Sequence, residues 1–339
     1  MPTLAADELE GLVRRIFVAA GTPARTAEIV AESLVLSSLK GVDSHGVMRV
    51  PEYLAHIETG RIVADAEPLV ERNGAVVRVA GGWCFGQLAA GEAARQVAAA
   101  GREAGVAVAT VTEVHHVGRL GRYVELAAAE GVVALAFCST GPPGGWVAPF
   151  GGRRAMVGTN PLAYAVPAGA HPPIVADFST SAAAEGRVRL ARRNGLDVPE
   201  GWLIDAEGRP TRDPGALYAG GALLPAGGHR GYALALLVEL LGGALAGAGC
   251  ALLGHSPGNG LVLVALDPAA WRDRTGFLAE VDAVAEALSA AEPADGVDRV
   301  RLPGEPEAEI EAIRRVEGIP IPDGIWGGLT EAAERLGVP

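Results

Sequence analysis

The sequence predicts an α/β protein in which a helical domain built from both chain termini accompanies a central α/β body. Residues 1–60 place apolar side chains at helical spacing in three successive segments. From residue 65 the chain changes to short β-rich runs, and a strand, a helix and a strand then follow with short links, as in a β-α-β unit. We expect the helical domain over residues 1–65 and 305–339, and the body over residues 66–304.

Capping residues and glycines delimit the expected amino-terminal helices. Each helix starts at a capping residue or a proline and stops at a glycine, a pattern typical of helix ends. The expected starts and ends are Thr3 and Gly21 for the first helix, Thr22-Pro23 and Gly41 for the second, and Asp43 or Ser44 and about Gly60 for the third.

The body is expected to open with a β-hairpin. In LVERNGAVVRV, two β-rich runs flank Asn73-Gly74, the preferred two-residue hairpin turn. Further strands are expected at 106–114, 132–140, 162–168, 173–180 and 260–267. Helices are expected near 87–104, 121–131, 181–194, 230–247, 274–292, 305–316 and 322–336.

Composition narrows the classes of function. The 339 residues carry a net charge of −12 and show no basic patch, so nucleic acid is not an expected partner. Three widely spaced cysteines form no disulfide framework, which indicates a reducing compartment, the cytoplasm. The acidic, helical amino terminus does not resemble a signal peptide. Lys40 is the only lysine and is a poor candidate for Schiff-base chemistry.

One segment, Gly231–Gly254, is apolar and long enough to span a membrane. Glu239 lies near its middle and would cost about 2.5–3.5 kcal/mol there. We therefore predict a buried helix and no membrane partner.

The stretch VDSHGVMRVPEYLAHI, residues 42–57, places His45, Arg49 and Tyr53 four residues apart. On one helix these side chains share a face, where a guanidinium next to an imidazole would suit a carboxylate ligand. The alternative is a solvated polar face that Ser44 merely caps.

Two adjacent histidines, His115 and His116, end a predicted strand. Ligands often bind at strand ends of α/β sheets. Because neighbouring strand residues point to opposite sides, the pair is not expected to chelate one metal. The alternative is one core imidazole and one surface imidazole.

Two further segments carry candidate ligand-binding groups. Asp177 lies in an apolar strand, where a buried carboxylate needs a partner such as a histidine or backbone amides, although it could simply end the strand and cap the next helix. Arg230 follows a Gly-Gly pair at the start of a long helix, which suits a phosphate, although an ordinary glycine loop has the same composition. The motifs GxGxxG, GxxxxGK[ST], GxSxG and HExxH are all absent.

Eight stretches in the same order resemble the NAD(P)-dependent malate/L-lactate dehydrogenase family, which includes sulfolactate and ureidoglycolate dehydrogenases and cyclic imino-acid reductases. They are GVDSHGVMRVPEYL, HHVGRLGRYVELAAAEGVVALAF, APFGG, GTNPLAYAVP, PPIVADFSTSAAAEGRV, GHRGYALALLVELLGGALAG, LPGEPE and GIPIPD. The resemblance implies a non-Rossmann dinucleotide-binding fold with a central mixed sheet flanked by helices. It also implies a cytoplasmic homodimer, NAD or NADP as cofactor, no metal, and hydride exchange with a small 2-hydroxy or 2-oxo carboxylate.

The resemblance also assigns roles to residues of this sequence. His116 would be the acid/base, with His45 as the other candidate proton donor, Ser44 beside it, and Asp177 orienting a histidine. The residues expected to contact the substrate are Arg49, Tyr53, Thr159 and His171. The residues expected to bind the cofactor are Thr140, Asn160, Asp177, Phe178, Ser179, Arg230, Gly304, Glu305 and Pro306.

The sequence departs from the family pattern at three positions. Val117 replaces a usual Phe, and Arg187 and Arg230 replace usual lysines. Arginine keeps the charge but changes its geometry, so the exact substrate and the choice between NAD and NADP stay open. Two other classes are considered: a ligand-binding protein that lost its chemistry, and a metal hydrolase that uses His115 and His116.

Overall fold

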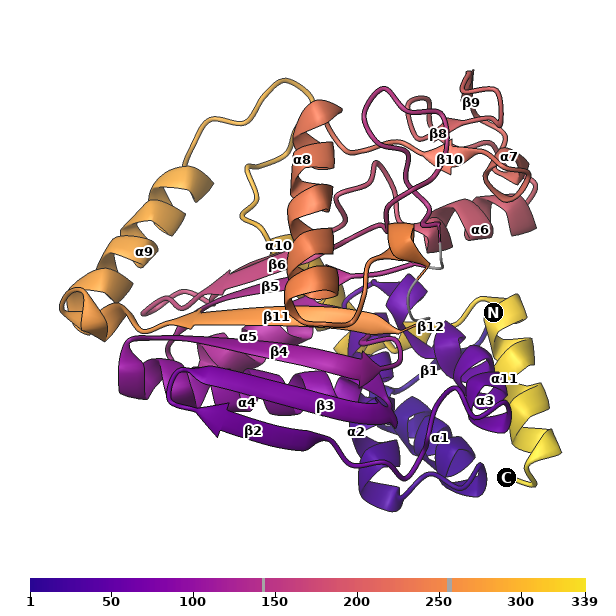
Figure 1. Cartoon of the computed structure of the whole chain (residues 1–339), viewed down its shortest axis with the longest axis horizontal. Helices are drawn as coiled ribbons and strands as arrows, with labels where there is room; N and C mark the ends of the chain where they lie inside the picture. The colour runs from indigo at the N-terminus through magenta and orange to yellow at the C-terminus, as the bar shows by residue number, and fades with distance from the viewer. Residues whose placement is uncertain (142–143, 255–257) are drawn as a thin grey trace.

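The computed structural model describes residues 1–141, 144–254 and 258–339. A seven-stranded mixed sheet of order β2-β3-β4-β11-β5-β6-β7 forms its centre (Figure 1). β3 and β4 are parallel, and the other neighbouring pairs are antiparallel. The strands are β2 Leu69–Asn73, β3 Val76–Cys84, β4 Val106–Val114, β5 Val133–Ser139, β6 Leu162–Val166, β7 Ile174–Phe178 and β11 Asn259–Leu266. The predicted α/β class and the β-hairpin are confirmed, but the two-residue turn is Gly74-Ala75, one residue later than expected, because Asn73 still pairs with Val76.

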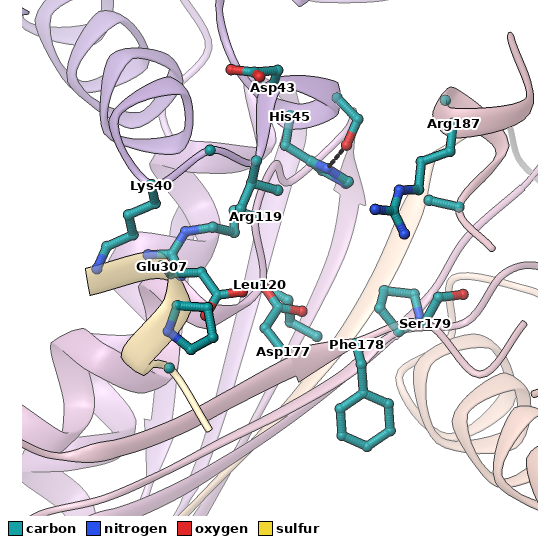
Figure 2. A pocket seen from close by; sticks show the side chains of 18 of the residues that line it. Lys40, Asp43, His45, Arg119, Leu120, Asp177, Phe178, Ser179, Arg187 and Glu307 are labelled. Carbon is teal, nitrogen blue, oxygen red and sulfur yellow. Dashed lines mark hydrogen bonds between the residues drawn. The ribbon is translucent and has the colours of Figure 1, made fainter. Parts of the chain in front are cut away.

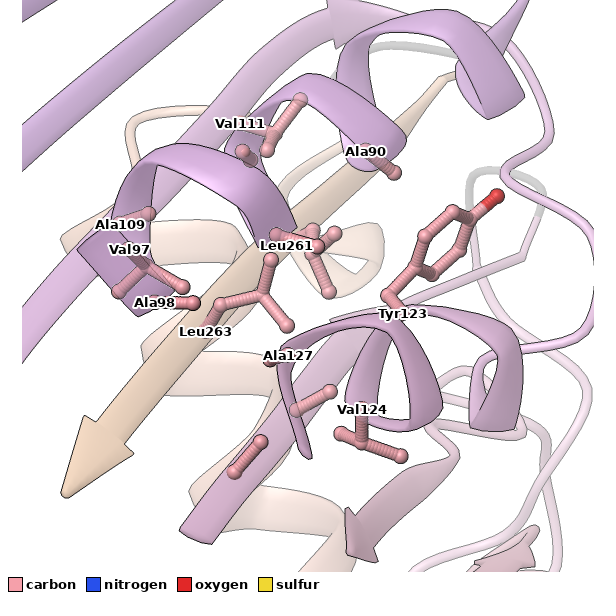
Figure 3. Close-up of a cluster of buried hydrophobic side chains, with 14 of the residues drawn as sticks. Ala90, Val97, Ala98, Ala109, Val111, Tyr123, Val124, Ala127, Leu261 and Leu263 are labelled. Atoms are coloured by element: carbon pink, nitrogen blue, oxygen red, sulfur yellow. The ribbon is translucent and has the colours of Figure 1, made fainter. Parts of the chain in front are cut away.

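Helices cover both faces of this sheet (Figure 1). One face is covered by α4 (Gly86–Ala104) and α5 (Gly121–Ala129), and the other by α8 (His229–Val238), which continues as the π-helical segment η3 (Glu239–Leu245). Small side chains of α4, such as Ala90 and Ala98, lie against the sheet together with Val97, Tyr123 and Leu261 (Figure 3). Because alanines bring the helix backbone close to the strands, this core is dense, as protein interiors are.

The two chain termini lie side by side. β1 (Thr3–Leu4) pairs antiparallel with β12 (Ile319–Pro320), so the first and last segments share a two-stranded sheet. One apolar cluster contains residues from both ends, among them Leu9, Phe17 and Leu329. The terminal helices are α1 Ala6–Ala19, α2 Ala24–Leu39, α3 Val50–Glu58, α10 Glu305–Glu317 and α11 Asp323–Arg335. The exact division into a helical domain and a body stays a prediction.

A smaller unit was not foreseen in the sequence. A three-stranded sheet of order β10-β8-β9 packs with α6 (Glu185–Arg193) and α7 (Gly215–Tyr218) around its own apolar cluster. Its strands, β8 Leu203–Ile204, β9 Pro210–Thr211 and β10 Ala222–Leu223, are two residues long, too short to show the alternation that identifies a strand in a sequence. α9 (Arg274–Ser289) follows β11.

The third predicted helix is wrong over its first part. Asp43–His45 and Val47–Arg49 form two separate 3₁₀ turns, and α3 starts only at Val50. The chain is extended at Gly46, which packs so close to Ser38 that a Cβ would lie 2.2 Å from its Oγ. The single helical face of His45, Arg49 and Tyr53 therefore does not exist.

Two other sequence expectations need correction. Thr3 does not cap α1, because it pairs with Pro320 in the terminal sheet and Ala5 takes the capping position. The segment Gly231–Gly254 is only half buried, since the outer face of α8 and η3 exposes leucines. Among the described helices, none is both long and apolar enough to cross a membrane.

We predict that Gly260→Ala destabilises the fold. A Cβ on Gly260 of β11 would lie 1.9 Å from the carbonyl oxygen of Gly242 in η3. Overpacking of this kind should lower the free energy of unfolding, measured by urea denaturation, by about 2–3 kcal/mol.

The matched control is Gly327→Ala on the exposed side of α11, where a new Cβ meets no atom within 4 Å. This substitution should raise the free energy of unfolding by about 0.5–1 kcal/mol, because alanine favours helix more than glycine does. Equal effects at the two sites would contradict the close approach of η3 to the sheet.

Candidate functional site

A cleft of about 1400 Å³ lies between the terminal helices, the edge strand β7 and α6 (Figure 2). Most of its lining comes from five segments: residues 40–45 before α3, the turn 118–120 after β4, residues 171–179 on and around β7, residues 181–194 with α6, and residues 301–308 at the start of α10. Segments far apart in the sequence therefore meet at one place.

The end of β4 places the two histidines beside the cleft. Neither histidine is among its lining residues, and neither are Arg49 and Tyr53, whereas His45 is. Gly86, the first residue of α4, lies against the peptide groups of His115 and His116, and a Cβ there would sit 2.6 Å from the carbonyl oxygens of both. The next peptide is held on both sides: the Asn259 Oδ1 accepts from the Val117 N–H at 3.0 Å, and the buried Tyr123 hydroxyl donates to the Val117 carbonyl. The strand end is thus rigidly placed.

The two histidines have different surroundings. The Nδ1 of His116 lies 2.7 Å from the hydroxyl of Tyr53, which is fully buried. The ring of His115 instead packs against His56, with ring centroids 4.3 Å apart. This divergence agrees with the expectation that the pair does not chelate one ion. Within the described residues, no group of three or more His, Cys, Asp or Glu side chains could hold a metal together.

His45 lies beside His116 despite the broken helix. Their rings stack with centroids 5.3 Å apart, and the Ser44 hydroxyl lies 3.0 Å from the His45 Nδ1. Gly186 of α6 packs against Ser44, where a Cβ would approach the Ser44 Cβ to 3.1 Å. The structure therefore brings together Ser44, His45, His116 and Tyr53.

The imidazoles of the site are neutral near pH 7. Burial, followed by the nearby Arg49 guanidinium, holds the pKa of His116 well below its usual value. The same two causes lower the pKa of His45 to about 3. Burial, and then His56, lowers the pKa of His115 to about 4. A neutral imidazole can accept a proton from a bound group.

Arg49 is held in place before any ligand arrives. Its Nε donates to the Ser44 carbonyl at 2.8 Å, and its Nη1 donates to Glu52 Oε2 at 2.8 Å. The side chain is 13% exposed. The guanidinium is therefore fixed, and a carboxylate ligand would share it with Glu52.

Asp177 is placed in the cleft but does not carry the expected contact. Its Oδ2 accepts from the Gly121 N–H at 2.6 Å, so the carboxylate caps α5. Within the described residues it has no hydrogen bond to a histidine, and Tyr53 occupies the Nδ1 of His116 instead. Asp177 therefore caps a helix, but α5 precedes β7 in the chain, so neither the orienting role nor the expected cap of the next helix describes this contact.

Thr140, Thr159 and Asn160 form a buried hydrogen-bonded group behind the cleft. The Thr140 and Thr159 hydroxyls are 2.9 Å apart, and Thr159 also lines the cleft. Asn160 is fully buried with a φ of 40°, and its Nδ2 donates to the Ala235 carbonyl and to Glu239 Oε2 at 3.0 and 2.7 Å. Its Oδ1 accepts from the Thr140 N–H. Asn160 therefore supports the wall of the cleft with every polar atom of its side chain.

The other expected residues divide into two groups. Phe178, Ser179, His171 and the segment Gly304–Pro306 line the cleft, although the His171 ring also lies 3.6 Å from Glu286 of α9. Arg230 is exposed in the first turn of α8 and is not part of the cleft lining.

Arg187, singled out in the sequence as a departure from the family pattern, points into the cleft (Figure 2). Two residues were missed in the sequence. Arg119 lines the cleft and is buried at 4% exposure against Glu125. Gln87 donates to the Tyr53 hydroxyl at 2.8 Å. A lone glutamine at the start of an alanine-rich helix was the available signal for this buried contact.

The cleft offers positive charge to an anionic ligand. The Nε and Nη2 atoms of Arg189 are buried without a hydrogen-bond partner among the described residues. The guanidinium has two longer ion-pair contacts, from Nη2 to Glu185 Oε2 at 3.8 Å and from Nη1 to Glu52 Oε2 at 3.9 Å. Its unbonded buried donors would be satisfied by a phosphate or carboxylate. The size of the cleft and this donor set fit a dinucleotide cofactor.

Comparison with known proteins gives a consistent result. A family described as malate/L-lactate dehydrogenase matches residues 4–330. The chain is 40% identical to a (2R)-3-sulfolactate dehydrogenase (NADP(+)) of Chromohalobacter salexigens over 92% of this chain and 91% of that protein. It is 36% identical to a Δ(1)-pyrroline-2-carboxylate/Δ(1)-piperideine-2-carboxylate reductase of Pseudomonas putida over 96% of this chain and 95% of that protein.

Solved structures agree with these relatives. The fold matches a sulfolactate dehydrogenase from Methanocaldococcus jannaschii with a TM-score of 0.90 and 29% identity, over 99% of this chain and 98% of that one. It also matches a Δ1-piperideine-2-carboxylate reductase from Pseudomonas syringae with a TM-score of 0.87 and 34% identity, over 98% of this chain and all of that one. The chain therefore belongs to the malate/L-lactate dehydrogenase family.

Proposed function

We propose that the chain is an NAD(P)-dependent dehydrogenase that interconverts a small 2-hydroxy acid and its 2-oxo acid, in the range of malate, lactate and sulfolactate. The His116 ring is the observation that carries this proposal. Because Tyr53 occupies Nδ1, the Nε2 atom is left to exchange a proton with a substrate. The fixed guanidinium of Arg49 lies nearby to hold a carboxylate.

The residues of the cleft fit a nicotinamide cofactor. Phe178, Ser179 and the segment Gly304–Pro306 would contact it, and Arg187 and Arg189 would face its phosphates. When bound, the cofactor supplies or accepts the hydride. The arginines of α6 would favour NADP over NAD where they reach the 2′-phosphate that only NADP carries. The name of the sulfolactate relative, which includes NADP(+), supports this preference.

The chain itself handles the proton and the substrate. Because His116 is neutral, its Nε2 can take the proton of the substrate hydroxyl while the hydride leaves the carbon that bears this hydroxyl. In the reverse direction, His116 returns the proton to the substrate oxygen. Arg49 orients the carboxylate, and alignment of the reacting carbon contributes to the rate as strongly as affinity does. His45 stacks on His116, where it excludes water from one face and remains the second candidate donor.

A substrate panel tests the proposal. Absorbance at the nicotinamide band should change when the protein is mixed with either cofactor and a set of 2-oxo acids, cyclic imino acids and ureidoglycolate. The cyclic imino acids form the alternative substrate class, since relatives named for them share the family. No turnover with any member of the panel would favour a non-catalytic ligand-binding role.

We further propose that two copies associate through the outer face of α8 and η3, in the cytoplasm. This face exposes Leu234, Leu236, Leu237, Leu240 and Leu245 by 39–64%. Contiguous apolar surface of this kind marks interfaces between proteins. The three cysteines are free, and Cys84 and Cys138 are buried, which agrees with a reducing compartment.

His116→Ala should lower kcat by about a hundredfold or more, the scale of lost general acid/base catalysis. In the unchanged protein, kcat/KM for alcohol oxidation should fall only on the acid side of pH 6.5, because the His116 pKa is lowered and the base must be unprotonated. Steady-state kinetics over pH 5–9 would measure both effects. Wild-type turnover in the alanine variant would move the role to His45.

Arg49→Lys should lose about 2–4 kcal/mol of transition-state stabilisation for a 2-oxo acid, since lysine keeps the charge but not the fork of the guanidinium. Cofactor affinity should be unchanged. The measurement is kcat/KM for the acid and for the corresponding neutral amide in both proteins. An equal loss for acid and amide would show that Arg49 is structural.

Leu237→Asp should convert the dimer into a monomer, because it places a charge on the apolar face of α8. Sedimentation velocity would report the mass. Leu288→Asp on α9 is the matched control, since Leu288 is exposed by 49% and Leu237 by 45%. A dimer that survives Leu237→Asp would place the interface elsewhere.

A further inference from the structure

A chain of hydrogen bonds continues behind His116, away from the cleft. The Gln87 Nε2 donates to the Tyr53 hydroxyl at 2.8 Å, and that hydroxyl lies 2.7 Å from the His116 Nδ1. Gln87 is 1% exposed and Tyr53 is fully buried. The Gln87 Oε1 is also buried, and it has no hydrogen-bond partner among the described residues. The amide thus keeps an unused acceptor next to the active histidine.

The direction of this chain determines which nitrogen of His116 carries the proton. A tyrosine hydroxyl has one proton to donate. If it accepts from the Gln87 amide, the buried Tyr53 proton has the His116 Nδ1 as its acceptor among the described residues, and the proton of the neutral ring then sits on the His116 Nε2. A ring in that state cannot take a proton from a substrate hydroxyl at Nε2, the nitrogen left for the substrate.

The working ring needs the opposite direction. Nδ1 must hold the proton and donate to the Tyr53 oxygen, so that the Tyr53 hydroxyl needs an acceptor of its own. A half-turn of the Gln87 amide brings Oε1 to that position. The terminal torsion of glutamine is broad and roughly two-fold, so both orientations are accessible to the side chain.

We propose that Gln87 is a positioning residue that sets the tautomer of His116 through Tyr53. When the Gln87 Oε1 faces Tyr53, the His116 Nε2 is free of a proton and acts as a base. When the Gln87 Nε2 faces Tyr53, the His116 Nε2 carries the proton and the ring is idle. The catalytic consequence rests on the proposed function, whereas the tautomer is a property of the chain alone. In alcohol oxidation the substrate proton moves to His116 Nε2, Nδ1 keeps its proton, and the same Nε2 proton returns to the substrate oxygen in reduction.

The other charged or titratable groups that face His116 stay the same when Gln87 is substituted. They are Arg49, His45, His115 and Arg189, and each disfavours the protonated ring. None of them contacts Gln87 through a hydrogen bond in the described part of the chain. Substitutions at Gln87 therefore change the partner of Tyr53 and leave these groups in place.

Two variants separate the orientations. Gln87→Met keeps the shape but can neither donate nor accept, and Gln87→Glu can accept from Tyr53 as a carboxylate. Gln96→Met is the matched control, because Gln96 lies on the same helix and, within the described residues, its side chain donates only to the partly exposed Glu92. Thermal unfolding shows whether each variant folds.

The primary measurement is the ¹⁵N NMR spectrum of histidine-labelled protein, with the His116 signals assigned by their loss in His116→Gln. The fraction of His116 with its proton on Nδ1 should rank Gln87→Glu above the unchanged protein, and the unchanged protein above Gln87→Met. An equal fraction in all three proteins overturns the proposal. If Gln87→Met does not fold, the proposal is overturned when Gln87→Glu shows the same fraction as the unchanged protein.

Kinetics supply the second measurement. Gln87→Met should lower kcat about tenfold or more with little change in KM, whereas Gln87→Glu should retain turnover and move the acid limb of the pH profile upward, since a carboxylate favours the imidazolium. Gln96→Met should change neither. Shifted tautomers in a protein that turns over no substrate would leave the tautomer inference standing and refute the proposed function.

Discussion

The contact between Tyr53 and His116 joins the two halves of the molecule at the site. Tyr53 belongs to α3 and to the apolar cluster of the terminal segments, whereas His116 follows β4 of the central sheet. Phe17 and Phe85 pack around the Tyr53 ring, with centroids 6.4 and 6.0 Å away. Because the tyrosine is fully buried, the histidine ring has its final orientation only when the terminal helices are docked on the sheet. Formation of the site is therefore part of folding.

Most of the positive charge in and beside the cleft comes from arginine. Arg49, Arg119 and Arg189 lie around the histidines and disfavour protonation of those rings, as burial also does. Arginine stays charged when buried, and its planar fork can be held by a carbonyl and a carboxylate while a further edge faces a ligand. The Arg49 contacts to Ser44 and Glu52 have this form. A fixed cation and neutral imidazoles can thus exist side by side.

Much of the fold could be predicted from the sequence, and the site only in part. The strand over 106–114 and the hairpin of β2 and β3 follow from β-rich runs and turn chemistry, which are local properties. The break at Gly46 could not be predicted, because it depends on the packing of Ser38 from α2. The partner of Asp177 could not be predicted either, since Gly121 is 56 residues away in the chain. Local chemistry identified the residues, and long-range packing determined their partners.

The π-helical turn η3 connects the cleft with the exposed leucines. Glu239, 3% exposed, accepts from the Asn160 Nδ2 on one side and from the Ala251 N–H on the other, so amide groups supply its hydrogen bonds within the described residues. Asn160 in turn holds the loop of Thr140 and Thr159 at the cleft. The outer face of the same helical segment carries the apolar surface proposed for a second copy. Association of two copies at that surface would therefore bury η3, the segment that holds Asn160 in the wall of the cleft through Glu239.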